Sequence, residues 1–130
     1  MSTLIALEAR TFIPSFTAND LDRSLKFYKG LGFSVTDEYK DGDKVQGVML
    51  AAGKAVLGLS QDDFAKGRDR VKGVGMRVHL ETDQDISTLA RQVKEAGIKL
   101  DAEPGPLPWG PMGFSVTDPD GYKLSISNPS

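Results

Sequence analysis

The sequence contains no cysteine and a single histidine, His79. The first absence excludes disulfide frameworks, thiol catalysis and cysteine-ligated zinc or iron–sulfur sites. The second restricts metal chemistry, because zinc, non-haem iron and copper sites generally need two or three imidazoles. Any metal site would therefore be rich in carboxylates or shared between subunits.

Long apolar runs and an excess of positive charge are also missing. The segment Met1–Glu8 has neither the basic region nor the apolar stretch of a secretory signal, so we expect a cytoplasmic protein. The 16 Lys and Arg residues are balanced by 18 Asp and Glu residues, for a net charge of −2. This charge provides no broad cationic field for phosphates or anionic lipids, so we expect neither nucleic acid nor a membrane as partner.

The composition is that of one folded domain, which we take to span residues 1–130. Hydrophobic residues make up 39% and charged residues 26%, as in an ordinary globular protein with one core. An internal repeat divides the chain, because residues 20–33 resemble residues 85–98 at an offset of 65. Asp20 then lies opposite Asp85, and Gly32 opposite Gly97.

Both copies of the repeated segment have the apolar periodicity of an amphipathic helix. In the second copy, Asp85 predicts an N-cap and Gly97 a left-handed C-terminal cap. In the first copy, Gly30 and Gly32 are expected to end the helix. The apolar stripes consist of Leu21, Leu25, Phe27 and Tyr28 in the first helix, and of Ile86, Leu89, Ala90 and Val93 in the second.

Strand-like segments surround each predicted helix, one before it and three after it, and glycine-containing turns at 41–43, 52–54 and 118–121 predict hairpins. The sequence therefore predicts an α+β protein of two βαβββ modules, about 8–62 and about 73–128, each with a curved mixed sheet. Each sheet would expose a concave face, so we expect the modules to pair into a barrel-like homodimer. The strand segments are 10–18, 33–39, 45–51 and 55–59 in the first module, and 73–81, 98–102, 113–118 and 122–127 in the second.

The modules are joined by the polar segment 61–73, which carries four cationic residues. We interpret it as a solvated connection, the alternative being a patch that binds anions. The cationic residues are Lys66, Arg68, Arg70 and Lys72.

Strand alternation places Arg77, His79 and Glu81 on one face of their strand, opposite Val78 and Leu80. Such a polar face is either exposed to solvent or lines a cavity in which these side chains meet a ligand. The sequence leaves both interpretations open.

Trp109 is the only tryptophan, and it lies in a segment stiffened by Pro104, Pro106, Pro108 and Pro111. A large aromatic side chain on a stiff loop is a good stacking platform, because little entropy remains to be lost on binding. The alternative is a tryptophan that caps the end of the core.

The two modules, the helix entry Asp20–Tyr28 and the turn Asp118–Gly121 together resemble the vicinal oxygen chelate superfamily, which includes glyoxalase I, extradiol dioxygenases and bleomycin-resistance proteins. The segments 13–20, 27–33 and 108–114 are most similar to the bleomycin-resistance branch. The resemblance implies a homodimer that exchanges its N-terminal strand near Pro14. It also implies grooves between the subunits that bind a planar or cationic drug, with Trp109 as a groove-lining aromatic.

The resemblance also implies four metal-ligand positions, and none carries a suitable ligand in this sequence. They correspond to Ile13, to Leu57 or Leu59, to Arg77 or Val78, and to Ser125. We therefore expect no metal and no cofactor.

The leading hypothesis is a metal-independent protein that binds a small, partly aromatic molecule in a dimer groove. The alternative is a lyase, isomerase or dioxygenase of the superfamily in which His79 and Glu81 act as displaced ligands or as general base and acid. A third possibility is a scaffold dimer without ligand. The expected ligand-binding residues are Trp109, Phe16, Met49, Arg77, His79, Glu81 and Phe114.

Overall fold

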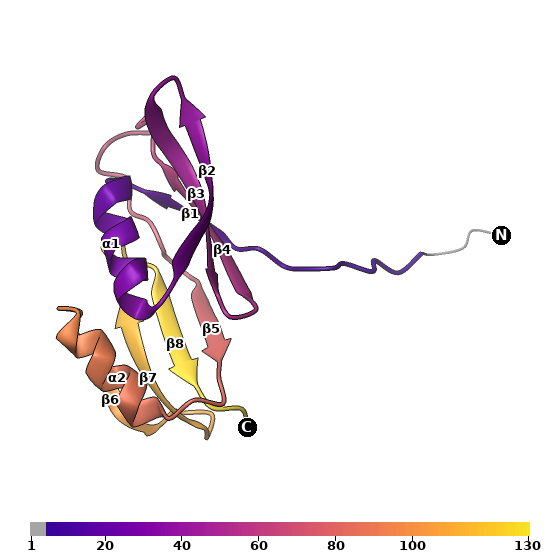
Figure 1. Cartoon of the computed structure of the whole chain (residues 1–130), viewed down its shortest axis with the longest axis vertical. Helices are drawn as coiled ribbons and strands as arrows, with labels where there is room; N and C mark the ends of the chain where they lie inside the picture. The colour runs from indigo at the N-terminus through magenta and orange to yellow at the C-terminus, as the bar shows by residue number, and fades with distance from the viewer. Residues whose placement is uncertain (1–4) are drawn as a thin grey trace.

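The computed structural model describes residues 5–130, and it contains two βαβββ modules in succession (Figure 1). The first four residues of the expected domain lie outside the described residues. Module 1 consists of β1 (Ser15–Ala18), α1 (Leu21–Leu31), β2 (Ser34–Asp41), β3 (Lys44–Ala52) and β4 (Ala55–Gln61). Module 2 consists of β5 (Arg77–Glu81), α2 (Ile86–Glu95), β6 (Ala102–Pro106), β7 (Met112–Thr117) and β8 (Lys123–Ser127).

Each module contains one four-stranded mixed sheet, and the two sheets have equivalent topology. Sheet A has the order β1-β4-β3-β2, and sheet B the order β5-β8-β7-β6. The first strand of each module runs parallel to the last, and the remaining neighbours are antiparallel. The predicted α+β class and mixed sheets are confirmed, while the sheets of one chain stay separate and form no closed barrel (Figure 1).

The helix boundaries follow from the caps. The side chain of Asp20 accepts a hydrogen bond from the Arg23 amide, and that of Asp85 accepts one from the Thr88 amide, so both helices have an aspartate N-cap. Gly32 and Gly97 have φ of +113° and +89°, which confirms the left-handed exits.

The prediction that Gly30 helps to end the first helix is wrong, because this residue lies inside α1. A Cβ atom there would lie 2.9 Å from Cδ1 of Ile98, which belongs to the other module. The glycine therefore serves close packing rather than the helix end.

The strand predicted at 98–102 is also wrong, since β6 begins only at Ala102 and continues through Pro104 to Pro106. β6 is the outer strand of sheet B, and an edge strand accommodates proline because one row of its amides has no partner in the sheet. The proline-rich segment is thus partly strand, and the loop that carries Trp109 is shorter than the sequence suggests.

A turn in module 2 joins the two modules through hydrogen bonds to module 1. The Tyr28 hydroxyl donates to Asp118 at 2.8 Å, and the Ser24 hydroxyl donates to Asp120 at 3.1 Å. Just beyond this turn, the ring of Tyr122 stacks on Phe16 with centroids 4.1 Å apart and planes 6° apart. These contacts make one continuous core from both modules.

The connection between the modules is anchored rather than fully solvated, so that expectation is wrong for Lys72. Its buried ammonium group lies 2.8 Å from the Asp62 carboxylate and donates a hydrogen bond to Asn19 at 2.6 Å. Arg70 binds the same carboxylate at 3.1 Å. The hydrogen bond from Lys72, together with one from the Phe64 amide, lowers the pKa of Asp62 to about 2.

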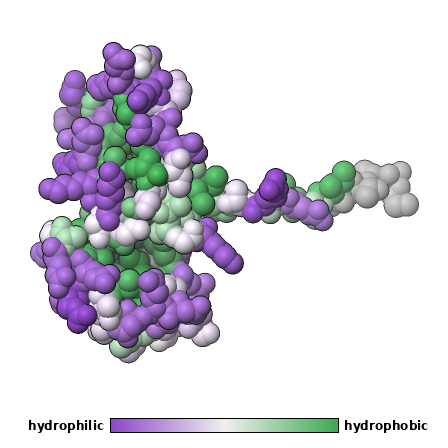
Figure 2. All heavy atoms as spheres, in the orientation of Figure 1, coloured by the Kyte–Doolittle hydropathy of each residue, from purple (hydrophilic) through white to green (hydrophobic). Residues whose placement is uncertain are grey.

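The segment before β1 extends away from the body of the molecule (Figure 1). Its apolar side chains are almost fully exposed, at 93% for Ile5, 89% for Leu7 and 89% for Phe12. Figure 2 shows apolar surface along this arm and also at the middle of the body, where the modules meet. We call residues 5–13 the N-terminal arm. Among the described residues, no helix is long and apolar enough to cross a membrane.

Candidate functional site

One face of sheet B is polar, and it is opposite the face that packs on the core. Strand register places Arg77 beside Lys123, His79 beside Ser125, and Glu81 beside Ser127. Paired residues of neighbouring strands share a face, so these side chains form one surface. We call this surface the polar face; its residues are Arg77, His79, Glu81, Ser115, Lys123, Ser125 and Ser127.

The centre of the polar face is a floor of small hydroxyl side chains. Ser115, Ser125 and Ser127 are buried, although all three belong to the solvent-facing side of the sheet. Arg77 folds over this floor and donates a hydrogen bond from its guanidinium group to the Ser125 hydroxyl at 2.8 Å. This hydrogen bond ties the arginine head group to the floor.

Trp109 reaches the polar face from the loop between β6 and β7. Its ring meets the His79 ring edge to face, with centroids 5.0 Å apart and planes at 80°. The loop is held by hydrogen bonds from the Leu107 amide to the Pro111 carbonyl and from the Gly110 amide to the Leu107 carbonyl, both 2.8 Å. Because Trp109 remains 50% exposed, a planar ligand can stack on it.

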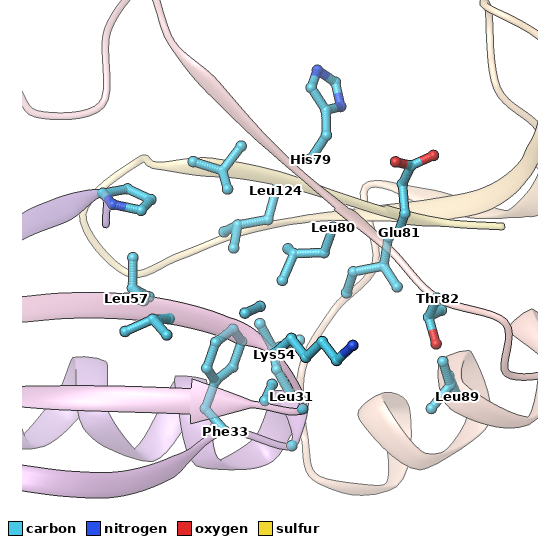
Figure 3. Close-up of a pocket in the computed structure, with 18 of the residues that line it drawn as sticks. Leu31, Phe33, Lys54, Leu57, His79, Leu80, Glu81, Thr82, Leu89 and Leu124 are labelled. Carbon is cyan, nitrogen blue, oxygen red and sulfur yellow. The ribbon is translucent and has the colours of Figure 1, made fainter. Parts of the chain in front are cut away.

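A groove of about 1250 Å³ lies on the other side of β5, between the two modules. Leu80 points across this groove toward Phe33 and Leu57, whereas His79 and Glu81, which also border the groove, extend from the opposite face of β5 (Figure 3). We call it the inter-module groove. Its apolar lining includes Leu31, Phe33, Leu57, Leu80 and Leu89, and its rim includes Phe12 and Pro14 at the root of the N-terminal arm.

The structure brings four of the predicted binding residues together, namely Arg77, His79, Glu81 and Trp109. Phe16 and Phe114 lie in the core at 1% and 0% exposure, although Phe114 also borders the inter-module groove. Met49 lies apart from these residues, in a hollow of about 450 Å³ on the open face of sheet A.

The positions implied as metal ligands do not fit a divalent cation. Leu57 and Leu59 belong to the core, Ile13 lies in the N-terminal arm, and Ser125 receives the hydrogen bond from Arg77. Within residues 5–130, no three His, Cys, Asp or Glu side chains come together in a way that could hold a metal ion. The side chains of the polar face are instead suited to hydrogen bonding and aromatic stacking.

Sequence reasoning missed the serine floor, because single serines on a strand usually indicate only an exposed face. The signal lies in their register, since Ser115 and Ser125 are paired and Ser127 follows two residues later. It also missed the buried pair Tyr28 and Asp118. Burial, followed by the neighbouring Asp118 carboxylate, raises the pKa of Tyr28, and burial also raises the pKa of Asp118. This pair belongs to the joint between the modules rather than to the polar face.

Comparison with protein families gives one match, which covers residues 13–126. The matching model is that of the Glyoxalase/Bleomycin resistance protein/Dioxygenase superfamily. No curated protein sequence matches this chain significantly.

Solved structures with the same fold include binding proteins and enzymes. A bleomycin-binding protein in complex with bleomycin has 22% identity and a TM-score of 0.70, covering 94% of this chain and 100% of that chain. A V278E mutant of glyoxalase I from Zea mays has 24% identity and a TM-score of 0.73, covering 91% of this chain and 44% of that chain. An integron cassette protein from V. cholerae has 20% identity and a TM-score of 0.71, covering 98% and 100%. At these identities the similarity establishes the fold and leaves the ligand open.

Proposed function

Because the chain belongs to the glyoxalase/bleomycin resistance protein/dioxygenase superfamily, we propose that it is a metal-independent binding protein, which sequesters a small aromatic molecule at the interface of a homodimer. The observation that carries the proposal is the polar face, where Trp109 and His79 stand over a serine floor beside an anchored Arg77. Aromatic walls with a few fixed polar groups are the usual composition of a small-molecule site.

The chemistry of the metal-ligand positions supports binding over metal-dependent catalysis. Aliphatic side chains occupy two of the four positions, and the serine at a third is engaged by Arg77. Binding proteins of this fold are known among the solved structures, one of them in complex with bleomycin. The same fold occurs in binding proteins and in enzymes, so the side chains at the metal-ligand positions are a better guide to function than the fold.

The extent of exposed surface supports a dimer. The chain exposes 8807 Å², whereas a compact monomer of 14.0 kDa is expected to expose about 6,700 Å². The N-terminal arm and the open sheet faces contribute to this excess, and a stable dimer buries about 800 Å² per partner. In the proposed dimer, sheet A of one protomer and sheet B of its partner enclose the ligand.

The N-terminal arm supports strand exchange near Pro14 in the proposed dimer. The Pro14 carbonyl accepts a hydrogen bond from the Gly58 amide at 2.8 Å, and the chain leaves sheet A immediately before this point. In such a dimer, the exposed Ile5, Leu7 and Phe12 of one protomer fit the apolar inter-module groove of the other. The rim of each groove lies close to the start of that protomer's own N-terminal arm. Each protomer would cover the groove of the other.

Light scattering and calorimetry test the proposal directly. We expect a mass of twice 14.0 kDa at micromolar concentration, and a compound from a panel of aromatic molecules and antibiotics that binds and raises the Tm. At one hundred times its Kd, such a ligand stabilises the protein by about 2.7 kcal/mol. A monomeric mass would contradict the proposed dimer, and a panel without any binder would contradict the proposed ligand binding.

Elemental analysis separates the proposal from an enzyme that uses a displaced metal site. We expect purified protein to hold no stoichiometric transition metal after dialysis. A metal retained at one equivalent and lost in His79→Ala would favour the enzyme, with His79 and Glu81 as its ligands.

A further inference from the structure

The charges on the polar face are separated along the strands. Arg77 and Lys123 are neighbours in register at one end of β5 and β8. Glu81 lies at the other end of β5. Asp101 lies at the same end as the two cations, because it accepts a hydrogen bond from the hydroxyl of Thr117, the register partner of Lys123. Within residues 5–130, neither Arg77 nor Lys123 takes part in an ion pair. This end of the face therefore carries two cations against one carboxylate.

Arg77 is prepared to bind an oxyanion. One of its terminal nitrogens donates to the Ser125 hydroxyl at 2.8 Å, which leaves the remaining N–H groups of the guanidinium available. The bond to a buried serine holds the planar group in place, so less side-chain entropy is lost when a carboxylate binds in the bidentate geometry. A neighbouring Lys123 adds a second positive charge on the same face.

The aromatic pair of His79 and Trp109 is next to Arg77 along the face, because His79 is the next residue of β5 on the same side. His79 follows Arg77 by two residues on the same face, which corresponds to about 7 Å along a strand. The ring of Trp109 meets His79 edge to face, and half of Trp109 is exposed. The β6–β7 loop lies at the Glu81 end of the sheet, because Gly113 pairs with Ser127 and Ser127 pairs with Glu81. A flat ring on Trp109 therefore reaches Arg77 by extending past His79 toward the other end of β5.

We propose that the polar face binds a planar aromatic ligand that carries a carboxylate or a similar oxyanion, with the ring on Trp109 and the oxyanion on Arg77. This inference rests on the proposed function and names the ligand class of the same site. It differs from a site for a cationic drug, because the anchored group is Arg77, which together with Lys123 outnumbers the single carboxylate of Asp101 at this end of the face.

The experiment compares three ligands of one shape, 2-naphthoate, 2-naphthamide and 2-naphthylmethylammonium, by calorimetry on the full chain. We expect 2-naphthoate to bind about 10- to 100-fold more tightly than the amide, because a hydrogen bond to a charged group is the stronger one. The preference should weaken as salt is added. In Arg77→Gln, the acid and the amide should bind equally.

The matched control is Arg91→Gln, which removes an exposed arginine from α2 and should keep the preference for the acid. Far-UV circular dichroism and the Tm verify that both variants are folded. Arg77→Lys should retain part of the preference, since lysine keeps the charge but loses the bidentate geometry.

Equal binding of acid and amide to the wild-type chain, or tighter binding of the ammonium compound, would overturn the ligand class and leave the binding function intact. The ligand class would also be overturned if other aromatic compounds of the panel bind but none of these three naphthalene compounds does. An Arg77→Gln variant that is monomeric by light scattering, but still binds the acid more tightly than the amide, would show that Arg77 contacts the partner subunit. This result would overturn its role in binding the oxyanion. If no aromatic compound of any charge binds, the proposed function fails as well.

Discussion

Tyr28 and Asp118 are joined by a buried hydrogen bond of 2.8 Å between a helix of module 1 and a turn of module 2. The same carboxylate group accepts the amides of Asp120 and Tyr122 at 2.8 and 2.9 Å. Asp118 therefore fixes its own turn and attaches this turn to the other module. Loss of the tyrosine hydroxyl leaves a buried carboxylate with one partner fewer.

Tyr28→Phe should lower the free energy of unfolding by about 1–3 kcal/mol, the cost of leaving a buried polar group without its partner. Chemical denaturation monitored by circular dichroism measures this change. Tyr39→Phe is the matched control, because Tyr39 is 68% exposed and its substitution should change the stability by less than about 0.5 kcal/mol. Equal effects of the two substitutions would contradict the role of Tyr28.

Gly73→Ala should be more harmful than Gly75→Ala, although the two residues have nearly the same φ of +72° and +75°. A Cβ atom on Gly73 would lie 2.5 Å from the Gly121 backbone, whereas Gly75 faces open space. Both variants incur the left-handed penalty of about 1–2 kcal/mol, and Gly73→Ala should lose about 1–3 kcal/mol more from overpacking. Thermal melts of the two variants measure this difference, and equal Tm values would contradict the role of the Gly73–Gly121 contact.

The ion pair of Asp62 predicts a loss of stability in acid. Lys72 and the Phe64 amide lower the pKa of Asp62 from 3.8 to about 2, so the folded state favours the ionised carboxylate. This stabilisation is complete above the pKa of the unfolded chain and is lost as the pH falls through about 2. The Tm difference between the wild type and Asp62→Asn should therefore shrink between pH 5 and pH 2. Asp43→Asn, at an exposed turn position, is the matched control for the loss of one carboxylate charge.

Trp109→Ala should separate ligand binding from folding. Because Trp109 is 50% exposed, its removal creates no buried cavity, and the stability should fall by less than about 1 kcal/mol. Binding of an aromatic ligand should weaken by about 1–3 kcal/mol, while Trp109→Phe should retain most of the affinity. A stability loss of about 3–5 kcal/mol with unchanged affinity would indicate instead that the tryptophan caps the core.

The helices and most strands could be predicted because their signals are local. The caps at Asp20 and Asp85 and the glycine exits at Gly32 and Gly97 depend on residues within one turn of the chain. β6 could not be predicted in the same way, since its prolines are acceptable only because it is an edge strand. That property depends on the sheet rather than on the segment itself.

The candidate site was predictable in part. Alternation along one strand was enough to group Arg77, His79 and Glu81. The contact of His79 with Trp109 joins residues 30 positions apart, and the floor under Arg77 depends on the pairing of β5 with β8. The burial of Phe16 was missed because it results from stacking on Tyr122, near the other end of the chain.

The contacts of Tyr122 have a consequence for the order in which the molecule is made. Its hydroxyl binds the backbone of Thr17 across a separation of 105 residues, so β1 gains its stacking partner only when the turn before β8 has left the ribosome. Module 1 therefore emerges without the Tyr122 ring that covers Phe16, and its core is completed only after Tyr122 has been synthesised. Such non-local closure slows folding and prolongs the exposure of apolar strands. A ribosome stalled a few residues before Tyr122 would hold a nascent chain that chaperones bind and proteases cleave.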